Sequence, residues 1–599
     1  PKPVPDPPVL QNQAGKVKVT VTNKGAETWT TGGYYLAYRA YDSKGKLVTQ
    51  QRAADVTGAV AHGGRITFDA TIKALPPGTY MLDFTMVRTG GKVFTDEQVP
   101  PGRLVLQVFD IAPVVKEQFP PNGYQAQTLT PQLWAAGVDI DAPPGLSLQY
   151  KFEICEADKE GKPTACTTSA YQPGSAYPVP AGRLKWGTTY LWRGFVKDAS
   201  NEVPTAQVAL VAAVPQPEIT SRLAEAQGKE FDPNVGNFTT AAIDASVAGV
   251  GPDLTLVRTY NSLDPRRDAA FGAGWSTRYD MRLTPDDDGT GNVVIRYPDG
   301  QDVRFGKNAD GTFAPPPGRF AKLTADAAAG TYRLQDKSGT VYDFSASGLL
   351  VKVTDPFSTA VTYTYSGGKL STAVNARTGR SLTFTWTGAH VTKVATNAVD
   401  GAALSWSYTY TGDRLDSVCD PAAGCTRYGY GAGSHYRTSV LDSRPESYWR
   451  LGEAEGTAAN SAVEVNLGKD RGTYTDVTLG TAGGITGDPG TAGTFNGTTS
   501  RVDLPSGTLK KSRDAAVEVW FKTIASGLGG PLVGYQNKAW GTAPTSGAPL
   551  LYVGTDGKLR GQFWTGTAAP ITDITKNVND GKWHHAVLSV SGSTQNLYL

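Results

Sequence analysis

Charge of one sign, histidine, methionine and long apolar runs are all scarce in this chain of 599 residues. Its 57 basic and 55 acidic residues leave a formal net charge of +2, and no basic stripe stands out. This balance lacks the electrostatic footprint of a nucleic-acid-binding protein. No apolar run approaches the ~18 residues that cross a bilayer as a helix, so we expect no membrane span. Arg266 and Arg267 form an isolated basic pair that we expect to be solvated.

Recognisable catalytic motifs are also missing. We find no G-x-S-x-G, no H-E-x-x-H and no phosphate-binding loop. The 5 histidines are scattered, apart from the adjacent His584 and His585. Neighbouring residues on a strand point to opposite faces, so these two rings could not share one metal ion. The sequence therefore predicts a chain that is not an enzyme and needs no cofactor.

Only 4 cysteines are present, and they fall into two local pairs, Cys155 with Cys166 and Cys419 with Cys425. The even number and short spacing favour two small disulfide loops in an oxidising compartment. A zinc site is the competing interpretation, but no C-x-x-C spacing occurs and only His435 lies near either pair. We therefore expect a secreted, extracellular or cell-surface protein.

Helical periodicity is rare as well, and the chain is instead rich in Gly (69) and Pro (39), with 10% aromatic residues. These features predict an all-β fold, and the length suggests about four domains of ~150 residues. Short alternating segments separated by turns predict a β-sandwich over residues 1–112 and a second over residues 113–216. The first resembles immunoglobulin-like adhesion modules. The second is similar to fibronectin type III domains, on the strength of Gly187 to Arg193, with Trp192 predicted in the core.

The organising feature of the chain is a series of aromatic pairs in which two rings stand two residues apart. Each pair ends a unit of two short strands joined by a turn, and the pairs recur roughly every 20 to 24 residues. On a strand, both rings of a pair point to one face, and a single hairpin cannot bury that face alone. Neighbouring units must therefore continue one sheet. The pairs are Tyr363 with Tyr365, Phe384 with Trp386, Tyr408 with Tyr410, and Tyr428 with Tyr430.

Residues 217–443, which contain these pairs, resemble the Rhs/YD-repeat proteins. Two motifs precede the repeats in the order that this family shows, R-x-Y-N-S and then F-G-x-G-W. The repeats depart from the family's Tyr-Asp dipeptide at Phe384, Trp386 and Tyr430. The resemblance implies a β-shell that encloses a toxic C-terminal domain, and about four units would make only its first turn. The motif residues are Arg258, Tyr260, Asn261, Phe271, Gly272, Gly274 and Trp275.

Residues 444–599 resemble a laminin-G-like, or concanavalin-like, jelly roll. The likeness rests on Tyr448 to Glu453, Val517 to Phe521 and Asp580 to Val587. Members of this family usually continue with more sheet after their final Leu-Tyr strand. We therefore expect the jelly roll to be truncated at Leu599 and the polypeptide to continue.

The jelly roll supplies the candidate binding residues. The resemblance implies calcium at a rim, with Asp503, Asp556 and Asp573 as candidate ligands on turns or strand ends. Aromatic rings stack on sugars, so Tyr535, Tyr552 and Trp564 are candidates for a glycan-binding wall. The alternative is that these rings belong to the core. No strand shows the E-x-D-x-x-E pattern expected of a glucanase, which makes a glycan-degrading enzyme the least favoured interpretation.

Two functions remain. In the first, the chain is the N-terminal part of a secreted polymorphic toxin, with the sandwiches and jelly roll as targeting or adhesion modules. Its partners would be further repeats and C-terminal cargo of its own chain, and a cell-surface glycan or protein receptor. In the second, it is a cell-envelope adhesion or glycan-binding scaffold with no toxin.

Overall fold

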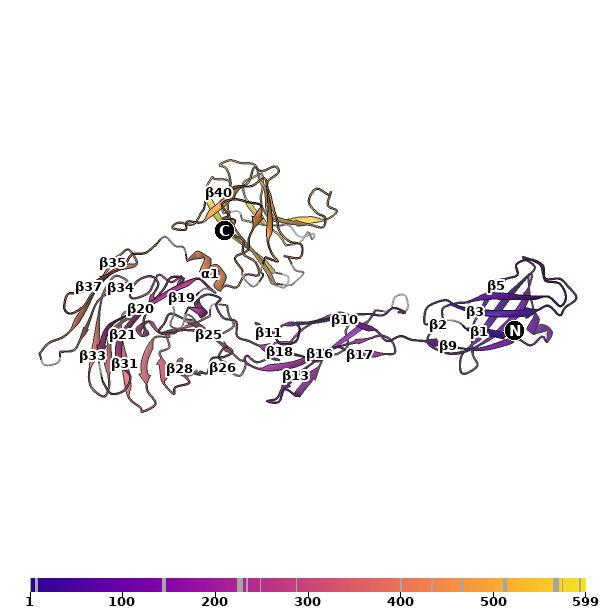
Figure 1. Cartoon of the computed structure of the whole chain (residues 1–599), viewed down its shortest axis with the longest axis horizontal. Coiled ribbons are helices and arrows are strands. Elements are labelled where there is room, and N and C mark those ends of the chain that lie inside the picture. The colour runs from indigo at the N-terminus through magenta and orange to yellow at the C-terminus, as the bar shows by residue number, and fades with distance from the viewer. Residues whose placement is uncertain are drawn as a thin grey trace. The chain divides into compact units, whose positions relative to one another are not determined.

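The computed structural model describes residues 2–599 apart from short gaps, and it confirms the predicted all-β fold class. The chain divides into two compact units: residues 1–215 with 287–292 and 305–323, and residues 216–286 with 293–304 and 324–599. Figure 1 labels the strands of both units. The residues not described are 1, 6–8, 143–146, 224–229, 233–234, 248, 287, 399–400, 432–434, 464–465, 467, 510–513, 564–569, 574 and 592–593.

The first sandwich has two sheets, ordered β1-β3-β6 and β2-β9-β7-β4-β5, with β8 beside β7. Alternating apolar residues from both sheets, such as Val17, Phe68 and Tyr38, share one core. Strand β5 is mostly polar and lies at the edge of its sheet. The strands are β1 (Lys2–Pro5), β2 (Val9–Leu10), β3 (Gly15–Thr22), β4 (Tyr34–Tyr41), β5 (Leu47–Asp55), β6 (Arg65–Ile72), β7 (Gly78–Arg88), β8 (Lys92–Val93) and β9 (Gly102–Phe109), and a 3-10 helix, η1, spans Phe94–Glu97.

The second sandwich pairs the sheet β10-β12-β15 with the sheet β11-β18-β16-β13-β14, and β17 lies beside β16. Trp192 is fully buried between them, as predicted, and packs in one core with Leu133 and Phe152. The strands are β10 (Val114–Phe119), β11 (Tyr124–Ala126), β12 (Gln132–Val138), β13 (Gln149–Ala157), β14 (Pro163–Thr168), β15 (Ala176–Pro178), β16 (Thr189–Lys197), β17 (Glu202–Pro204) and β18 (Val208–Ala212).

A lead-in segment, residues 220–314, precedes the eleven-stranded sheet that contains the aromatic units. Its first four strands form the sheet β19-β20-β21-β22, and the next four form the sheet β23-β24-β25-β26. The strands are β19 (Phe231–Asp232), β20 (Asn237–Val247), β21 (Leu254–Asn261), β22 (Trp275–Ser276), β23 (Arg282–Pro285), β24 (Val293–Arg296), β25 (Asp302–Lys307) and β26 (Phe313–Ala314), with 3-10 helices η2 (Thr220–Arg222) and η3 (Arg278–Asp280).

The aromatic units lie in an eleven-stranded sheet in which each strand neighbours the next in sequence, from β27 to β37. Strands β31, β33, β34 and β35 can be followed in Figure 1. This order is what hairpins stacked one after another produce. The strands are β27 (Lys322–Asp326), β28 (Thr331–Gln335), β29 (Val341–Phe344), β30 (Leu350–Thr354), β31 (Ala360–Ser366), β32 (Lys369–Asn375), β33 (Ser381–Thr387), β34 (His390–Thr396), β35 (Ser405–Thr411), β36 (Arg414–Cys419) and β37 (Cys425–Arg427).

Helix α1 (Tyr436–Asp442) follows this sheet, and Leu441 packs with Ile219, Leu223 and Val235. The remaining strands form four small sheets, and the sheets β43-β48-β49 and β44-β45-β46-β47 share an apolar core. The strands are β38 (Ala458–Ala459), β39 (Gly472–Thr475), β40 (Thr478–Ala482), β41 (Thr491–Thr494), β42 (Arg501–Asp503), β43 (Ala515–Lys522), β44 (Gly530–Gln536), β45 (Gly547–Val553), β46 (Leu559–Gly561), β47 (Ile571–Thr572), β48 (Trp583–Ser591) and β49 (Thr594–Tyr598).

Candidate functional site

The first rings of three aromatic pairs are buried on strands of the eleven-stranded sheet. Tyr363 in β31, Phe384 in β33 and Tyr408 in β35 are 9%, 5% and 3% exposed. Tyr428 directly follows β37, and its main-chain N–H donates to the Asp416 carbonyl at 2.9 Å. Three of the four rings expected to share a sheet therefore lie in it, whereas Tyr428 is half-buried just beyond the end of β37.

In the first three pairs, the second ring reaches back to the strand before it. The Tyr365 hydroxyl donates to the Leu350 carbonyl at 2.8 Å, and the Tyr410 hydroxyl donates to the Val391 carbonyl at 2.7 Å. The Trp386 indole N–H makes the same contact with the Leu370 carbonyl at 2.7 Å. A β-bulge stands at the second ring in all three units. We call these three contacts the ring clasps, because each ties a strand to its predecessor through a side chain.

The lead-in segment places an ion pair against this aromatic face. Arg258 in β21 and Asp244 in β20 have side chains that are 1% and 5% exposed, and they form two hydrogen bonds of 2.5 and 2.8 Å. The register of β20 against β21 shifts between Ile243 and Ala245. This bulge is where Asp244 stands.

Three aromatic side chains surround the Arg258 guanidinium. Its central carbon lies 4.5 Å from the Trp275 ring, 5.4 Å from the Tyr428 ring and 5.9 Å from the Tyr408 ring. The Tyr408 hydroxyl donates to Asp244 at 2.9 Å, and Arg258 donates to the Tyr428 hydroxyl at 3.1 Å. Residues from the lead-in motif and from two repeat units therefore form one buried cluster, which we call the arginine cluster.

The pKa values in this cluster follow from burial and charge. Burial by itself lowers the pKa of Arg258, but hydrogen bonding and the charge of Asp244 outweigh it, so the pKa is raised. Burial, followed by the charge of Asp244, raises the pKa of the Tyr408 hydroxyl. Arg258 and the Tyr408 hydroxyl thus keep their protons, and the cluster holds the guanidinium as a cation beside the Asp244 carboxyl group.

The F-G-x-G-W motif fills the space beside the cluster. Phe271 packs edge-on against Tyr408 at 5.1 Å, and the Trp275 indole donates to the Tyr430 hydroxyl at 2.8 Å. Gly272 has a φ of +94°, and a Cβ there would stand 2.9 Å from the Leu415 nitrogen. Only glycine fits this close approach without strain.

Two further lead-in motif residues hold the lead-in strands together. The Asn261 amide donates to the Asp299 carbonyl at 2.8 Å and accepts from Asn237 at 2.9 Å. Tyr260 packs against Trp275 at 5.2 Å and Tyr430 at 5.7 Å. Gly274, with a φ of +83°, lets this ring approach, because a Cβ there would stand 2.6 Å from it.

Sequence reasoning missed three members of the site. Tyr279 packs between Tyr363 and Phe384, at 6.1 and 5.0 Å, and no periodic signal marks it. Asp244 carries no motif either. Arg266 was expected to be solvated, and this was wrong: its side chain is 11% exposed and pairs with Asp264 and with Asp302, the latter at 2.7 Å.

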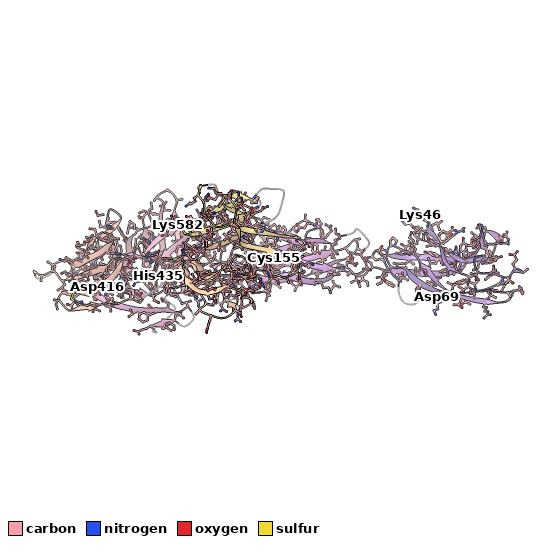
Figure 2. The ribbon with its side chains drawn as sticks, turned by 90° about the horizontal axis from the view of Figure 1, so that it is seen from above. Lys46, Asp69, Cys155, Asp416, His435 and Lys582 are labelled. Atoms are coloured by element: carbon pink, nitrogen blue, oxygen red, sulfur yellow. A yellow bond between two sulfur atoms is a disulfide. The ribbon has the colours of Figure 1, made fainter. Side chains whose placement is uncertain are left out.

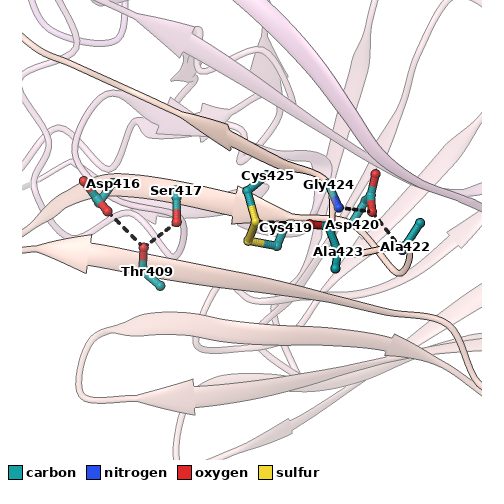
Figure 3. The surroundings of a disulfide bond; sticks show 9 residues. All are labelled: Thr409, Asp416, Ser417, Cys419, Asp420, Ala422, Ala423, Gly424 and Cys425. Carbon is teal, nitrogen blue, oxygen red and sulfur yellow. Dashed lines mark hydrogen bonds between the residues drawn. A yellow bond between two sulfur atoms is a disulfide. The ribbon is translucent and has the colours of Figure 1, made fainter.

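Both predicted disulfides are present in the structure. Cys155, labelled in Figure 2, is buried in β13 and bonds Cys166 in the exposed strand β14. Cys419 at the end of β36 bonds Cys425 at the start of β37, as Figure 3 shows. Each bridge therefore joins two neighbouring antiparallel strands.

The calcium candidates do not come together. Asp503 accepts from Arg501 at 2.9 Å, Asp556 pairs with Arg560 at 2.7 Å, and Asp573 accepts from the Thr575 hydroxyl at 2.5 Å. In the part of the chain that the structure describes, no three His, Cys, Asp or Glu side chains are grouped so that they could hold a metal ion. Calcium in the jelly roll stays a prediction.

The structure describes two of the three glycan candidates. Tyr535 is 43% exposed, and its hydroxyl donates to the Phe563 carbonyl at 3.1 Å. Tyr552 is half-buried in β45, opposite Arg560. Trp564 lies outside the described residues. A glycan-binding wall at these rings therefore remains a prediction.

The adjacent histidines have separate partners. His584 lies 2.9 Å from Asp580, and His585 lies 2.9 Å from Glu518 and stacks on Trp520 at 4.8 Å. Among the described residues, no helix is long and apolar enough to cross a membrane.

Comparisons with known proteins match parts of the chain. The profile of a domain of unknown function, DUF6531, matches residues 228–305, and that of the Concanavalin A-like lectin/glucanases superfamily matches residues 496–599. The tRNA nuclease WapA of Bacillus subtilis (strain 168) is 36% identical over 131 residues, which is 22% of this chain and 5% of the relative. The tRNA(Glu)-specific nuclease WapA of Bacillus subtilis subsp. natto matches to the same extent.

The matched stretch thus spans about a twentieth of these curated relatives. Among solved structures, the FN1–FN3 domains of chicken CNTN1 align with 59% of this chain and 96% of their own, at 11% identity and a TM-score of 0.18. A TM-score this low supports no conclusion about the fold.

Proposed function

We propose that this chain is the non-catalytic N-terminal part of a secreted Rhs/YD-repeat protein. In this proposal, residues 1–112 and 113–216 are immunoglobulin-like and fibronectin type III-like modules for targeting, and residues 444–599 are a laminin-G-like module for adhesion. Residues 217–443 form the first turn of a β-shell that encloses a C-terminal toxin.

The observation that carries the proposal is the way the lead-in segment covers the eleven-stranded sheet. A sheet with one aromatic face must bury that face, and here the arginine cluster and the F-G-x-G-W motif bury it. Because every strand pairs with its sequence neighbours, further units could extend the same sheet by the same hairpin geometry. Such an arrangement suits the start of an enclosure.

The similarity to WapA supports the toxin half of the proposal. Those relatives are nucleases by name, and they are about twenty times longer than the matched stretch. We therefore do not assign nuclease activity to this chain. It indicates only the kind of toxin that a longer polypeptide containing this chain would carry.

The second candidate is an adhesion or glycan-binding scaffold of the cell envelope without a toxin. The profile match of residues 496–599 to a lectin and glucanase superfamily favours it. In that case the eleven-stranded sheet would be a spacer between binding modules.

Limited proteolysis of the polypeptide encoded by the complete gene separates the two. The toxin proposal predicts a C-terminal segment that resists protease in the native protein, is digested after unfolding, and arrests growth when produced alone inside cells. A polypeptide that ends in a wall anchor, or whose C-terminal part is protease-accessible and harmless, would contradict it.

A further inference from the structure

Carboxylates gather where the first sandwich passes into the second, inside the first compact unit. Asp110 follows β9, Asp139 and Asp141 follow β12, and Asp198 follows β16. The Asn201 amide N–H donates to Asp110 at 2.9 Å and to Asp198 at 3.3 Å, so one amide group bridges two of the four. Loops far apart in sequence therefore bring acidic groups to one place.

Asp141 is the most buried member, at 3% exposure. Its Oδ2 accepts from the Ile111 N–H at 3.0 Å, and its main-chain carbonyl accepts from the Asn12 amide at 3.0 Å. Its Oδ1 is buried and has no hydrogen-bond partner among the described residues. A buried, unpartnered carboxylate oxygen is costly unless a cation or proton meets it.

Asp139 lies beside Asp141, because its Oδ1 accepts from the Asp141 main-chain N–H at 3.2 Å. Burial, a side-chain hydrogen bond with the Asp141 carboxyl, and the charges of Asp141 and Asp198 raise the pKa of Asp139, although that N–H lowers it. Lysine and arginine are not among the main causes of the shift. Two carboxylates held together without a basic partner repel each other, and a bound cation would remove the repulsion.

Amide side chains lie at the same junction. The Gln11 amide N–H donates to Asp110, as the Asn201 amide does. Within the described part of the chain, the amide oxygens of Gln11 and Asn201 accept no hydrogen bond. The described residues hold no group of three His, Cys, Asp or Glu side chains that could bind a metal ion, so a cation here would need such neutral oxygens besides the two carboxylates.

We propose that Asp139 and Asp141 hold a divalent cation, Ca²⁺, at the junction of the two sandwiches, with amide and main-chain oxygens completing its shell. All these donors are oxygens from loops between strands, a set that suits Ca²⁺ better than Mg²⁺ or Zn²⁺. Two carboxylates make a weak site, in the ~10⁻⁴–10⁻³ M range of extracellular modules.

The site would tie the two sandwiches to each other. Asn12 and Ile111 belong to the first sandwich and its exit, and both bond to Asp141 at the end of β12. A cation that fixes the Asp141 carboxylate would thus stiffen the junction. The inference is independent of the toxin role, because it concerns only the first unit.

The test is a CaCl₂ titration of the whole 599-residue chain by isothermal calorimetry, after EDTA treatment, with MgCl₂ as the comparison. We expect one saturable Ca²⁺ site that is weakened at least ~10-fold in Asp139→Asn and in Asp141→Asn. The control Asp69→Asn, an exposed carboxylate of the first sandwich, should bind as the parent does. At about ten times Kd, Ca²⁺ should raise the first unit's Tm by ~3–6 °C.

Other outcomes decide against the proposal. Absence of saturable Ca²⁺ binding, or binding that both junction variants retain, would overturn it. The proposal would also be overturned if Ca²⁺ left the Tm of the EDTA-treated protein unchanged while mild acid raised it. In that case a proton shared by the two carboxylates, and not a cation, would remove their repulsion. Asp139 is only half-buried, so Asp139→Asn keeps the test valid if Asp141→Asn fails to fold.

Discussion

Arg258 shows at the scale of one residue why the lead-in motif is needed. A guanidinium buried to this degree is tolerated only when it is paired and hydrogen-bonded. Asp244 supplies the counter-charge, the Tyr428 hydroxyl accepts a further hydrogen bond, and three aromatic rings, that of Tyr428 among them, surround the guanidinium. The motif arginine was predictable from the sequence. Its partner was not, because Asp244 reaches the site through a bulge in β20 that leaves no periodic signal.

Removing the charge of Asp244 should destabilise the second unit strongly. In Asp244→Asn the guanidinium stays buried without a counter-charge, and we expect a loss of ~3–5 kcal/mol in the free energy of unfolding. Urea denaturation followed by tryptophan fluorescence measures it. The control is Asp343→Asn, which breaks the pair with the mostly exposed Arg333 and should cost less than ~1 kcal/mol. Equal losses of unfolding free energy in the two variants would show that the buried pair stabilises the protein no more than an exposed one.

The buried tyrosines predict a loss of stability at high pH. Burial is the main cause that raises the pKa of Tyr342 to about 12, and it raises those of Tyr363, Tyr365 and Tyr410 as well. Their contribution to stability is full below pH ~10, the unfolded value, and is lost as the pH rises toward the folded values. Ultraviolet titration should therefore show tyrosines that ionise only as circular dichroism reports unfolding. Complete ionisation near pH ~10 in a folded protein would refute this.

At the scale of one element, a hairpin of two strands, the ring clasps add side-chain hydrogen bonds to the main-chain pairing. The sequence predicted the strands and the shared face of the two rings from their spacing. It did not predict the bulge at the second ring or the carbonyl that the ring binds, because both depend on how the next hairpin twists. The sequence did not predict the polar strand β5 either, because this strand lies at a sheet edge, where little of it is buried.

Tyr410→Phe and Tyr365→Phe should each weaken one hairpin with little change in packing. Each removes a hydrogen bond to the carbonyl of a buried residue, Val391 or Leu350, and the expected cost is ~1–3 kcal/mol. Chemical denaturation measures it. Tyr552→Phe, whose hydroxyl has no partner among the described residues, should stay within ~0.5 kcal/mol of the parent. A clasp variant as stable as this control would mean that the clasps are incidental.

The disulfides act on the edge hairpins. Strand β14 is exposed along its whole length, so Cys155–Cys166 is its main attachment besides main-chain pairing. Reduction should lower the stability of the second sandwich by ~2–5 kcal/mol, measured by thermal denaturation with and without dithiothreitol. Thiol titration should find no reactive thiol in the native protein and four after unfolding and reduction. Four reactive thiols in the native state would contradict the bridges.

At the scale of the whole molecule, the account depends on the lead-in segment and the repeat hairpins folding as one body. The all-β class and the aromatic face followed from composition and spacing. The calcium and glycan candidates of the jelly roll remain predictions, because rim ligands depend on loop geometry that no short pattern encodes; Asp503 and Asp556, for example, pair with nearby arginines.

Native-state hydrogen exchange, read by mass spectrometry on the parent and on Asp244→Asn, tests this dependence most directly. We predict that peptides from β20–β22 and from β31–β36 exchange with one common free energy, and that the substitution lowers both by the same amount. If β20–β22 lose protection while β31–β36 keep theirs, the sheet does not need its lead-in cover, and the account is wrong.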